Sequence, residues 1–457
     1  MKEVVFLGKI FLNRGEIMKN KNLIYLVVLL VMGFFTTSVI AQGVTITILA
    51  GGGPHLLSPR RAAEIYEKET GNKVIIVESP HKDLYAKALT DLIGGGRSYD
   101  AFQFSYTQLA TFVAGGFLQP IDEYIEKYQA GNLFDDILPT IREMYTKWGD
   151  KTYAFVYDGD THSYYYRTDL FSDPEIKAKF KELFGYDLRP ATTWDEYLDI
   201  SKFFYKSKYV QYGNSELAQR GRMYFWWASR FFGYGGEWFD ENGKPAINSE
   251  AGLKALENFK ESIKYSPPGV LNFEFSEHQE AWLTGSIPQF VQWGDAWLDG
   301  QLSPASQVKG KIGISIPPNG GGVLAGGWAY AIPKDAKGKE AFEFLKIMTF
   351  GENSVWAVTT PGSGIQPYLK KTHFENPEVI NALGKEFLEG YSQSLAMGKA
   401  EVRIPYAAEF VDYLDLNLSK ALAGELDSQE ALDAAAQKWV ELLERYFGSS
   451  TLPLKFR

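Results

Sequence analysis

Residues 44–54 have the sequence VTITILAGGGP, in which β-branched side chains alternate before three glycines and a proline. This alternation predicts a strand, and the Gly-Pro cluster predicts the loop that ends it. A helix is expected over 58–69, with Ser58 as its N-cap and Pro59 at its first position. Residues 73–78 (KVIIVE) predict a second strand.

The same order continues along the chain. A helix is expected over 81–93, before three glycines, and a short buried strand over 100–104. Strand-helix-strand units of this kind favour right-handed crossovers and a largely parallel sheet. Such sheets bind ligands at the carboxyl ends of their strands, which here are the loops 51–55 and 105–107.

Further elements follow downstream. Strands are expected at 152–157 and 287–292, and helices at 339–349 and 425–446. Thr193 begins a capping-box sequence, TWDE. Residues 240–248 predict a hairpin turn rather than a calcium loop, because the terminal bidentate Glu is missing. Chain crossings near 153–158 and 312–317 are expected to join two lobes.

Length and composition restrict the function. The chain has 457 residues, more than the ~250–300 that one core supports, so two lobes are expected. A net charge of −9 leaves no basic surface for nucleic acid. Cys is absent and His occurs five times, so we expect no disulfide, metal site or cofactor. Aromatic residues make up 15% of the chain and suit ligand platforms as well as cores.

The N-terminus has the features of a signal peptide over residues 1–41. Lys19 and Lys21 precede an apolar run over 23–35, and small residues follow, so cleavage is expected after Ala41. The alternative is a retained membrane anchor, because 23–41 approaches the ~20 residues that span a bilayer. The signal begins at Met18, so we expect translation to start there and residues 1–17 to come from an over-extended gene prediction. The exported chain would be more acidic still.

A series of landmarks in a fixed order resembles the family 1 extracellular solute-binding proteins, the maltose-binding-protein-like sugar-capturing components of ABC importers. The similarity extends over nearly all of the exported chain. The landmarks are 44–53, GRSYDAFQ at 96–103, GFLQPI at 116–121, YYRTDLF at 165–171 with Thr193-Trp194, AWLTGS at 281–286, Gly327-Trp328, AFEFL at 341–345, and Gly424-Glu425 with Ala431-Leu432.

The resemblance implies an α/β, two-lobed periplasmic-binding-protein fold (type II), with mixed parallel sheets, flanking helices and a ligand cleft between lobes. Lobe 1 would take 44–155 and 317–352, and lobe 2 would take 156–316 and 353–457. It further implies a periplasmic or extracellular, monomeric, non-enzymatic protein that closes on a carbohydrate by hinge motion. The partner would be the transmembrane subunits of an ABC permease.

Carboxylates and indoles together suit a sugar, because a carboxylate accepts hydroxyl protons and an indole covers the C–H face. Trp293 and Asp295 are expected on a strand-end loop, 293–297, that resembles the family's Trp-bearing cleft loop; Trp297 is assigned to the core. Asp158 and Asp160 flank a glycine at the crossing, and Asp160 matches a family sugar-binding position. The alternative for both is a solvated or backbone-capping turn.

Other candidates depend more on the resemblance. Trp328 either stacks on ligand or packs in the core. One ring of the helical run containing Tyr224, Trp226 and Trp227 is expected in the cleft. Loops matching family contact loops add His55, Phe104, Tyr106, Ser363, Arg403 and Tyr406. Arg403 would either pair with an acid of the other lobe or grip a ligand carboxylate.

Two rival functions remain at this point. An exported glycoside hydrolase would need two acids on opposite sides of one bond, such as Asp160 and Asp295. No motif marks either residue as catalytic. A ligand-binding partner of a chemoreceptor would share the fold and differ only in what it docks onto.

Overall fold

The computed structural model describes residues 43–95, 98–360 and 362–456, and residues 45–457 form a compact unit. The predicted signal peptide lies outside the described residues. Within those ranges, no helix is both long and apolar enough to span a membrane.

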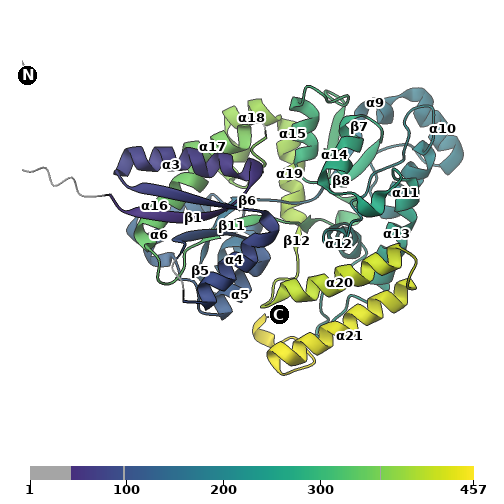
Figure 1. Cartoon of the computed structure of the whole chain (residues 1–457). Helices are drawn as coiled ribbons and strands as arrows, with labels where there is room; N and C mark the ends of the chain where they lie inside the picture. The colour runs from purple at the N-terminus through teal and green to yellow at the C-terminus, as the bar shows by residue number, and fades with distance from the viewer. Residues whose placement is uncertain (1–42, 96–97, 361, 457) are drawn as a thin grey trace, which may run out of the picture. The chain divides into compact units, whose positions relative to one another are not determined.

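A five-stranded sheet, here called the first sheet, contains the N-terminal strands. Its order is β2 (Lys73–Ser79), β1 (Thr45–Gly51), β3 (Ala101–Ser105), β11 (Trp328–Ala331) and β6 (Ala154–Asp158). β1 pairs in parallel with β2 and β3, which confirms the predicted βαβ units. β11 is antiparallel to β3 and β6, so the sheet is mixed. In Figure 1, α3 (Leu57–Thr70) and α4 (His81–Ile93) lie on opposite sides of this sheet.

The predicted cap of α3 is wrong. The helix begins at Leu57, directly after a 3-10 turn over Gly53–Leu56, and its N-cap is Leu56 without a side-chain hydrogen bond. Ser58 lies inside the helix, where its Oγ accepts a hydrogen bond from Asn353 Nδ2 at 3.0 Å. The turn and the helix are continuous, so no free end remains for Ser58 to cap.

The second sheet has the order β8 (Gln289–Gln292), β7 (Ser163–Arg167) and β9 (Ile312–Ser315) and is antiparallel throughout. Outside the first sheet, the short strands β10 (Val323–Leu324) and β12 (Lys399–Ala400) also pair in parallel. Beside the second sheet, α11 (Trp194–Phe204) begins as predicted, because Thr193 Oγ1 accepts the Glu196 amide hydrogen bond at 3.1 Å. The turn at 240–248 is also confirmed, since the amide nitrogens of Asn242 and Lys244 both donate to Asp240 Oδ1.

The remaining helices and short strands pack around the first and second sheets (Figure 1). The helices are α5 (Leu109–Ala114), α6 (Asp122–Lys127), α7 (Gly131–Asp135), α8 (Pro139–Ile141), α9 (Thr168–Ser172), α10 (Pro174–Phe184), α12 (Met223–Gly233), α13 (Glu250–Ser262), α14 (Phe275–Leu283), α15 (Asp295–Leu302), α16 (Gly338–Thr349), α17 (Gly351–Thr359), α18 (Pro377–Leu383), α19 (Lys385–Met397), α20 (Ala407–Leu422) and α21 (Ser428–Phe447). The short strands are β4 (Lys147–Trp148), β5 (Lys151–Thr152), β10 (Val323–Leu324) and β12 (Lys399–Ala400).

The chain passes between the sheets at two places that matter for the site. Residues 159–162 join β6 of the first sheet to β7 of the second, and residues 316–327 lead from β9 back to β11. Asp158 still pairs with Trp328 in the first sheet, so the first crossing begins after Asp158. Side chains on these crossings are therefore held between the two sheets.

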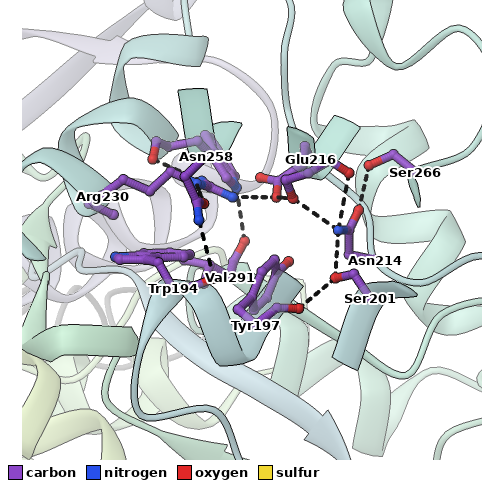
Figure 2. A network of polar contacts seen from close by, with 12 residues as sticks. Trp194, Tyr197, Ser201, Asn214, Glu216, Arg230, Asn258, Ser266 and Val291 are labelled. Carbon is purple, nitrogen blue, oxygen red and sulfur yellow. Dashed lines mark hydrogen bonds and ion pairs between the residues drawn. The ribbon is translucent and has the colours of Figure 1, made fainter. Parts of the chain in front are cut away.

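A buried polar network holds α12 in place beside the second sheet (Figure 2). Arg230 pairs with Glu216 at 2.5 Å and donates through Nε to Asn258 Oδ1 at 2.9 Å, and both ions are essentially unexposed. The guanidinium also lies 4.3 Å from the centre of the Trp194 ring. Because α12 carries Tyr224 and Trp226, the network sets the position of aromatic side chains that reach the crossings.

Candidate ligand-binding site

One edge of the first sheet gathers polar and aromatic side chains. His55 and His81 follow the carboxyl ends of β1 and β2, and Asp158 ends β6. Trp328 joins them because β11 runs antiparallel and begins at this edge. The His81 ring centre lies 4.7 Å from those of both His55 and Trp328. This is the edge at which open α/β sheets bind ligands.

Four carboxylic acids, here called the acid cluster, converge beside this edge: Asp158, Asp160, Asp295 and Glu401. Asp158 and Asp160 belong to the crossing from β6 to β7, Asp295 begins α15, and Glu401 follows β12. Electrostatic repulsion links Asp160 to the other three. The cluster therefore draws on segments from both sheets.

The acid cluster has no cation to balance it. In the part of the chain that the structure describes, no Lys or Arg forms an ion pair with any of the four. His55 Nε2 lies 3.9 Å from Asp158 Oδ2, but burial lowers the His55 pKa to about 3, so the ring is neutral near pH 7. Burial raises the pKa of all four acids, and that of Asp295 and of Glu401 reaches about 7.

Aromatic rings surround the acids. Trp293 is 5% exposed, and its Nε1 donates to the Ala325 carbonyl at 2.7 Å. Tyr106 and Tyr145 stack with ring centres 4.3 Å apart. A Cβ at Gly327 would lie 1.8 Å from the Tyr145 hydroxyl oxygen, so only glycine allows that tyrosine to approach the crossing. The Tyr145 hydroxyl also donates to the Asp160 backbone carbonyl at 3.3 Å, so aromatic side chains lie beside the acid cluster.

A pocket of about 280 Å³ adjoins Asp295. It is lined, among others, by Asp295, Leu298 and Asp299 of α15, Val358 of α17, Ser363 of the segment after α17, and Leu383 at the end of α18. The predicted loop at 293–297 is shorter than expected, since α15 already begins at Asp295. The helix holds the Asp295 side chain at the pocket wall. Among the described residues, no group of three His, Cys, Asp or Glu side chains is arranged to hold a metal ion.

The structure brings most of the predicted residues together. Asp158, Asp160, Trp293, Asp295, Trp328, His55 and Tyr106 surround the crossings, and Ser363 lines the pocket. The Tyr224 hydroxyl donates to Glu401. Trp226 packs against Trp293, with ring centres 5.3 Å apart, and so supports that side chain. Trp297 is buried and stacks on Phe387, as the core assignment predicted.

Four other candidates make their contacts elsewhere. Phe104 is buried between Phe102 and Phe112, and Trp227 stacks on Phe231 in the core. Tyr406 is exposed and stacks on Tyr446 at 4.1 Å. Arg403 donates to the Lys147 carbonyl and covers the Trp148 ring, and Glu143 attracts its charge, so it faces the elements around the first sheet; a grip on a ligand carboxylate stays a prediction.

Several residues at the site were missed in the sequence. Glu401, Gln366 and Tyr145 lie in segments far apart along the chain, with no local motif to mark them. Gln366 donates its backbone NH to Asp158 Oδ1 at 2.7 Å. His81 could have been found, because it directly follows the carboxyl end of the second predicted parallel strand.

The acid cluster predicts an unusual pH dependence of stability. The Asp295 pKa is about 7 in the folded chain, against an ordinary value near 4, so the fold holds a proton that the unfolded chain releases. Stability should therefore fall as pH rises through this window. Surface acids with lowered pKa values, such as Glu67 and Glu261, act at more acidic pH, where their protonation lowers stability as the pH falls.

We expect the melting temperature of the ligand-free protein to fall as pH rises from about 6.5 to about 8. Below that range the buried histidines, whose pKa values are lowered by burial, are neutral in the fold and oppose the trend. Calorimetric scans across this range measure the slope. Asp295→Asn cannot titrate and should flatten it. An Asp295→Asn slope equal to that of the natural chain would show that Asp295 ionises freely.

Comparison with known proteins gives consistent results. The family model for bacterial extracellular solute-binding proteins matches residues 58–353. A Sinorhizobium fredii protein named as a probable amino-acid ABC transporter periplasmic-binding protein is 28% identical over 66% of this chain and 67% of its own length.

Two solved structures have similar folds. The solute-binding protein of Agrobacterium radiobacter in complex with ribitol is 24% identical, with a TM-score of 0.73 over 88% of this chain and 99% of its own. Maltose-bound MalE3 of T. maritima is 22% identical, with a TM-score of 0.73 over 88% of this chain and 100% of its own. These likenesses confirm the predicted two-lobed α/β fold.

Proposed function

Because the chain belongs to the bacterial extracellular solute-binding proteins, we propose that it captures a sugar or polyol and delivers it to an ABC permease. The observation that carries this proposal is the acid cluster at the sheet edge, with Trp328 paired to Asp158 in the sheet and Trp293 and Asp160 both near Gly326. Carboxylates accept hydrogen bonds from vicinal hydroxyls, and indoles cover the apolar sugar face. The solved relatives named for ribitol and maltose support the same ligand class.

An amino acid is a less suitable ligand. One relative is named for amino-acid transport, but an α-carboxylate needs a cation or several NH donors at the site. The acid cluster would repel it. Catalysis is likewise not proposed, because the family consists of binding proteins. Asp160 and Asp295 would instead accept hydrogen bonds from ligand hydroxyls.

Export and hinge closure complete the proposal. Members of this family act outside the cytoplasm, and the signal over residues 1–41 would direct export, with cleavage after Ala41. Closure would bend the crossings at 159–162 and 316–327, and the first lobe would keep β6 to Asp158 instead of ending at 155. The protein would work as a monomer with the transmembrane subunits of the permease.

A thermal-shift screen of residues 42–457 against neutral sugars, polyols and sugar acids tests the function. A ligand at 100 times its Kd stabilises the fold by about 2.7 kcal/mol and raises the melting temperature. We expect at least one polyhydroxylated compound to do so. Trp328→Ala should weaken the response, because the ring is partly exposed at the sheet edge. A flat response across the panel would contradict the proposal.

A further inference from the structure

We propose that the ligand of this site carries a basic amine in addition to its hydroxyls, as an amino sugar does. This inference rests on the proposed function and narrows it to one chemical class. It starts from two independent observations at the crossings: carboxylates that lack a cation, and a buried amide side chain that lacks any partner.

Not all acid-cluster oxygens are free for a ligand. Glu401 Oε1 accepts the Gly326 amide hydrogen bond at 2.9 Å, and its other oxygen accepts that of the Tyr224 hydroxyl. Asp158 Oδ1 accepts a hydrogen bond from the backbone NH of Gln366. The side chain of Asp160 is hydrogen-bonded to that of Asp158, an arrangement that requires a shared proton. Asp160 has a second carboxylate oxygen besides the one shared with Asp158, and in the described structure no other residue donates a hydrogen bond to the Asp295 carboxylate, so these two acids are available to a ligand.

Gln366 supplies the second observation. Its side chain is fully buried, and neither Oε1 nor Nε2 has a hydrogen-bond partner in the described structure. Oε1 lies 2.0 Å from the position that a Cβ on Gly294 would occupy, so the amide reaches the residue before Asp295. Its backbone holds Asp158 at the same time. In the described structure a donor and an acceptor thus remain unsatisfied between Asp158, which the Gln366 backbone holds, and Gly294, the residue before Asp295.

A cationic ligand satisfies this arrangement better than a neutral one. Neighbouring carboxylates oppose each other's ionisation, and a hydroxyl brings no charge to relieve that repulsion. An ammonium group donates up to three hydrogen bonds, enough for Asp160, Asp295 and Gln366 Oε1. Such charge-assisted bonds are stronger than those of a hydroxyl.

Two other charged ligands fit less well. A metal ion would need at least three side-chain ligands, and no such group exists among the described residues. A sugar acid would bring a further negative charge to the cluster. A ligand that carries both an amine and hydroxyls matches the free carboxylates and the side-chain amide of Gln366.

Matched probes test the inference. We would measure melting-temperature shifts and calorimetric affinities at pH 7 for D-glucosamine, D-glucose and N-acetyl-D-glucosamine, and for the corresponding galactose set. The amino sugar of at least one set should bind at least ~10-fold more tightly than its neutral and N-acetylated counterparts. Asp295→Asn should remove most of that preference. Glu250→Gln, which alters an exposed acid of α13, should preserve it.

The outcomes separate this inference from the function beneath it. Neutral sugars that bind as well as amino sugars would overturn the inference and leave sugar capture intact. A preference for sugar acids would overturn it as well. No response from any sugar would overturn both. An amine preference that survives in both Asp160→Asn and Asp295→Asn would contradict the role assigned to the acid cluster.

Discussion

Asp160→Asn is expected to raise the melting temperature of the ligand-free protein and to abolish most of the ligand-induced rise. Burial is the main effect that opposes ionisation of Asp160 and raises its pKa, and repulsion from Asp158, Asp295 and Glu401 adds to it. The isosteric amide removes this repulsion, which should stabilise the empty fold on the order of 1 kcal/mol at pH 8. The same change removes a charged acceptor, and affinity should fall at least ~10-fold.

The two readouts move in opposite directions, which makes the test specific. Calorimetric melting without ligand gives the first, and titration with any compound that stabilises the natural chain gives the second. Asp412→Asn, an exposed acid of α20, is the control and should change neither. A lower melting temperature for Asp160→Asn would assign Asp160 to structure instead of ligand binding.

Glu216→Ala is expected to destabilise the protein by about 3–5 kcal/mol. The substitution leaves the Arg230 guanidinium buried without its counter-ion, inside the network of Figure 2. Asn258 and the Trp226 carbonyl still accept from Arg230, but neither carries a charge. Chemical denaturation measures the loss.

Glu216→Ala should also reduce the apparent ligand affinity, in proportion to the fraction of protein that remains folded. The reason is that α12 positions Tyr224 and Trp226 at the site. Glu250→Ala is the matched control, since its Lys254 pair is solvent-exposed and should contribute no measurable stability. If Glu216→Ala melted like the Glu250→Ala control, the buried pair would be dispensable and other contacts would hold α12.

The sequence alone determined the order of the elements and much of their extent. Alternation at 44–50 and the following Gly-Pro cluster gave β1, and α4 has the bounds that its periodicity predicted. These features depend on neighbours within a few residues, so local patterns encode them. Asp158 and Asp160 could be found for the same reason, since they lie where a strand runs into a glycine turn.

Only the tertiary structure decided which side chains meet. Glu401 and Gln366 join Asp158 from more than 200 residues away, through crossings whose contacts no local spacing records. Phe104 shows the converse: β3 is buried on both faces, so strand periodicity could not tell a core ring from a ligand contact. Sequence patterns assign a residue to an element, whereas the site depends on where distant elements pack, and packing is a property of the whole fold.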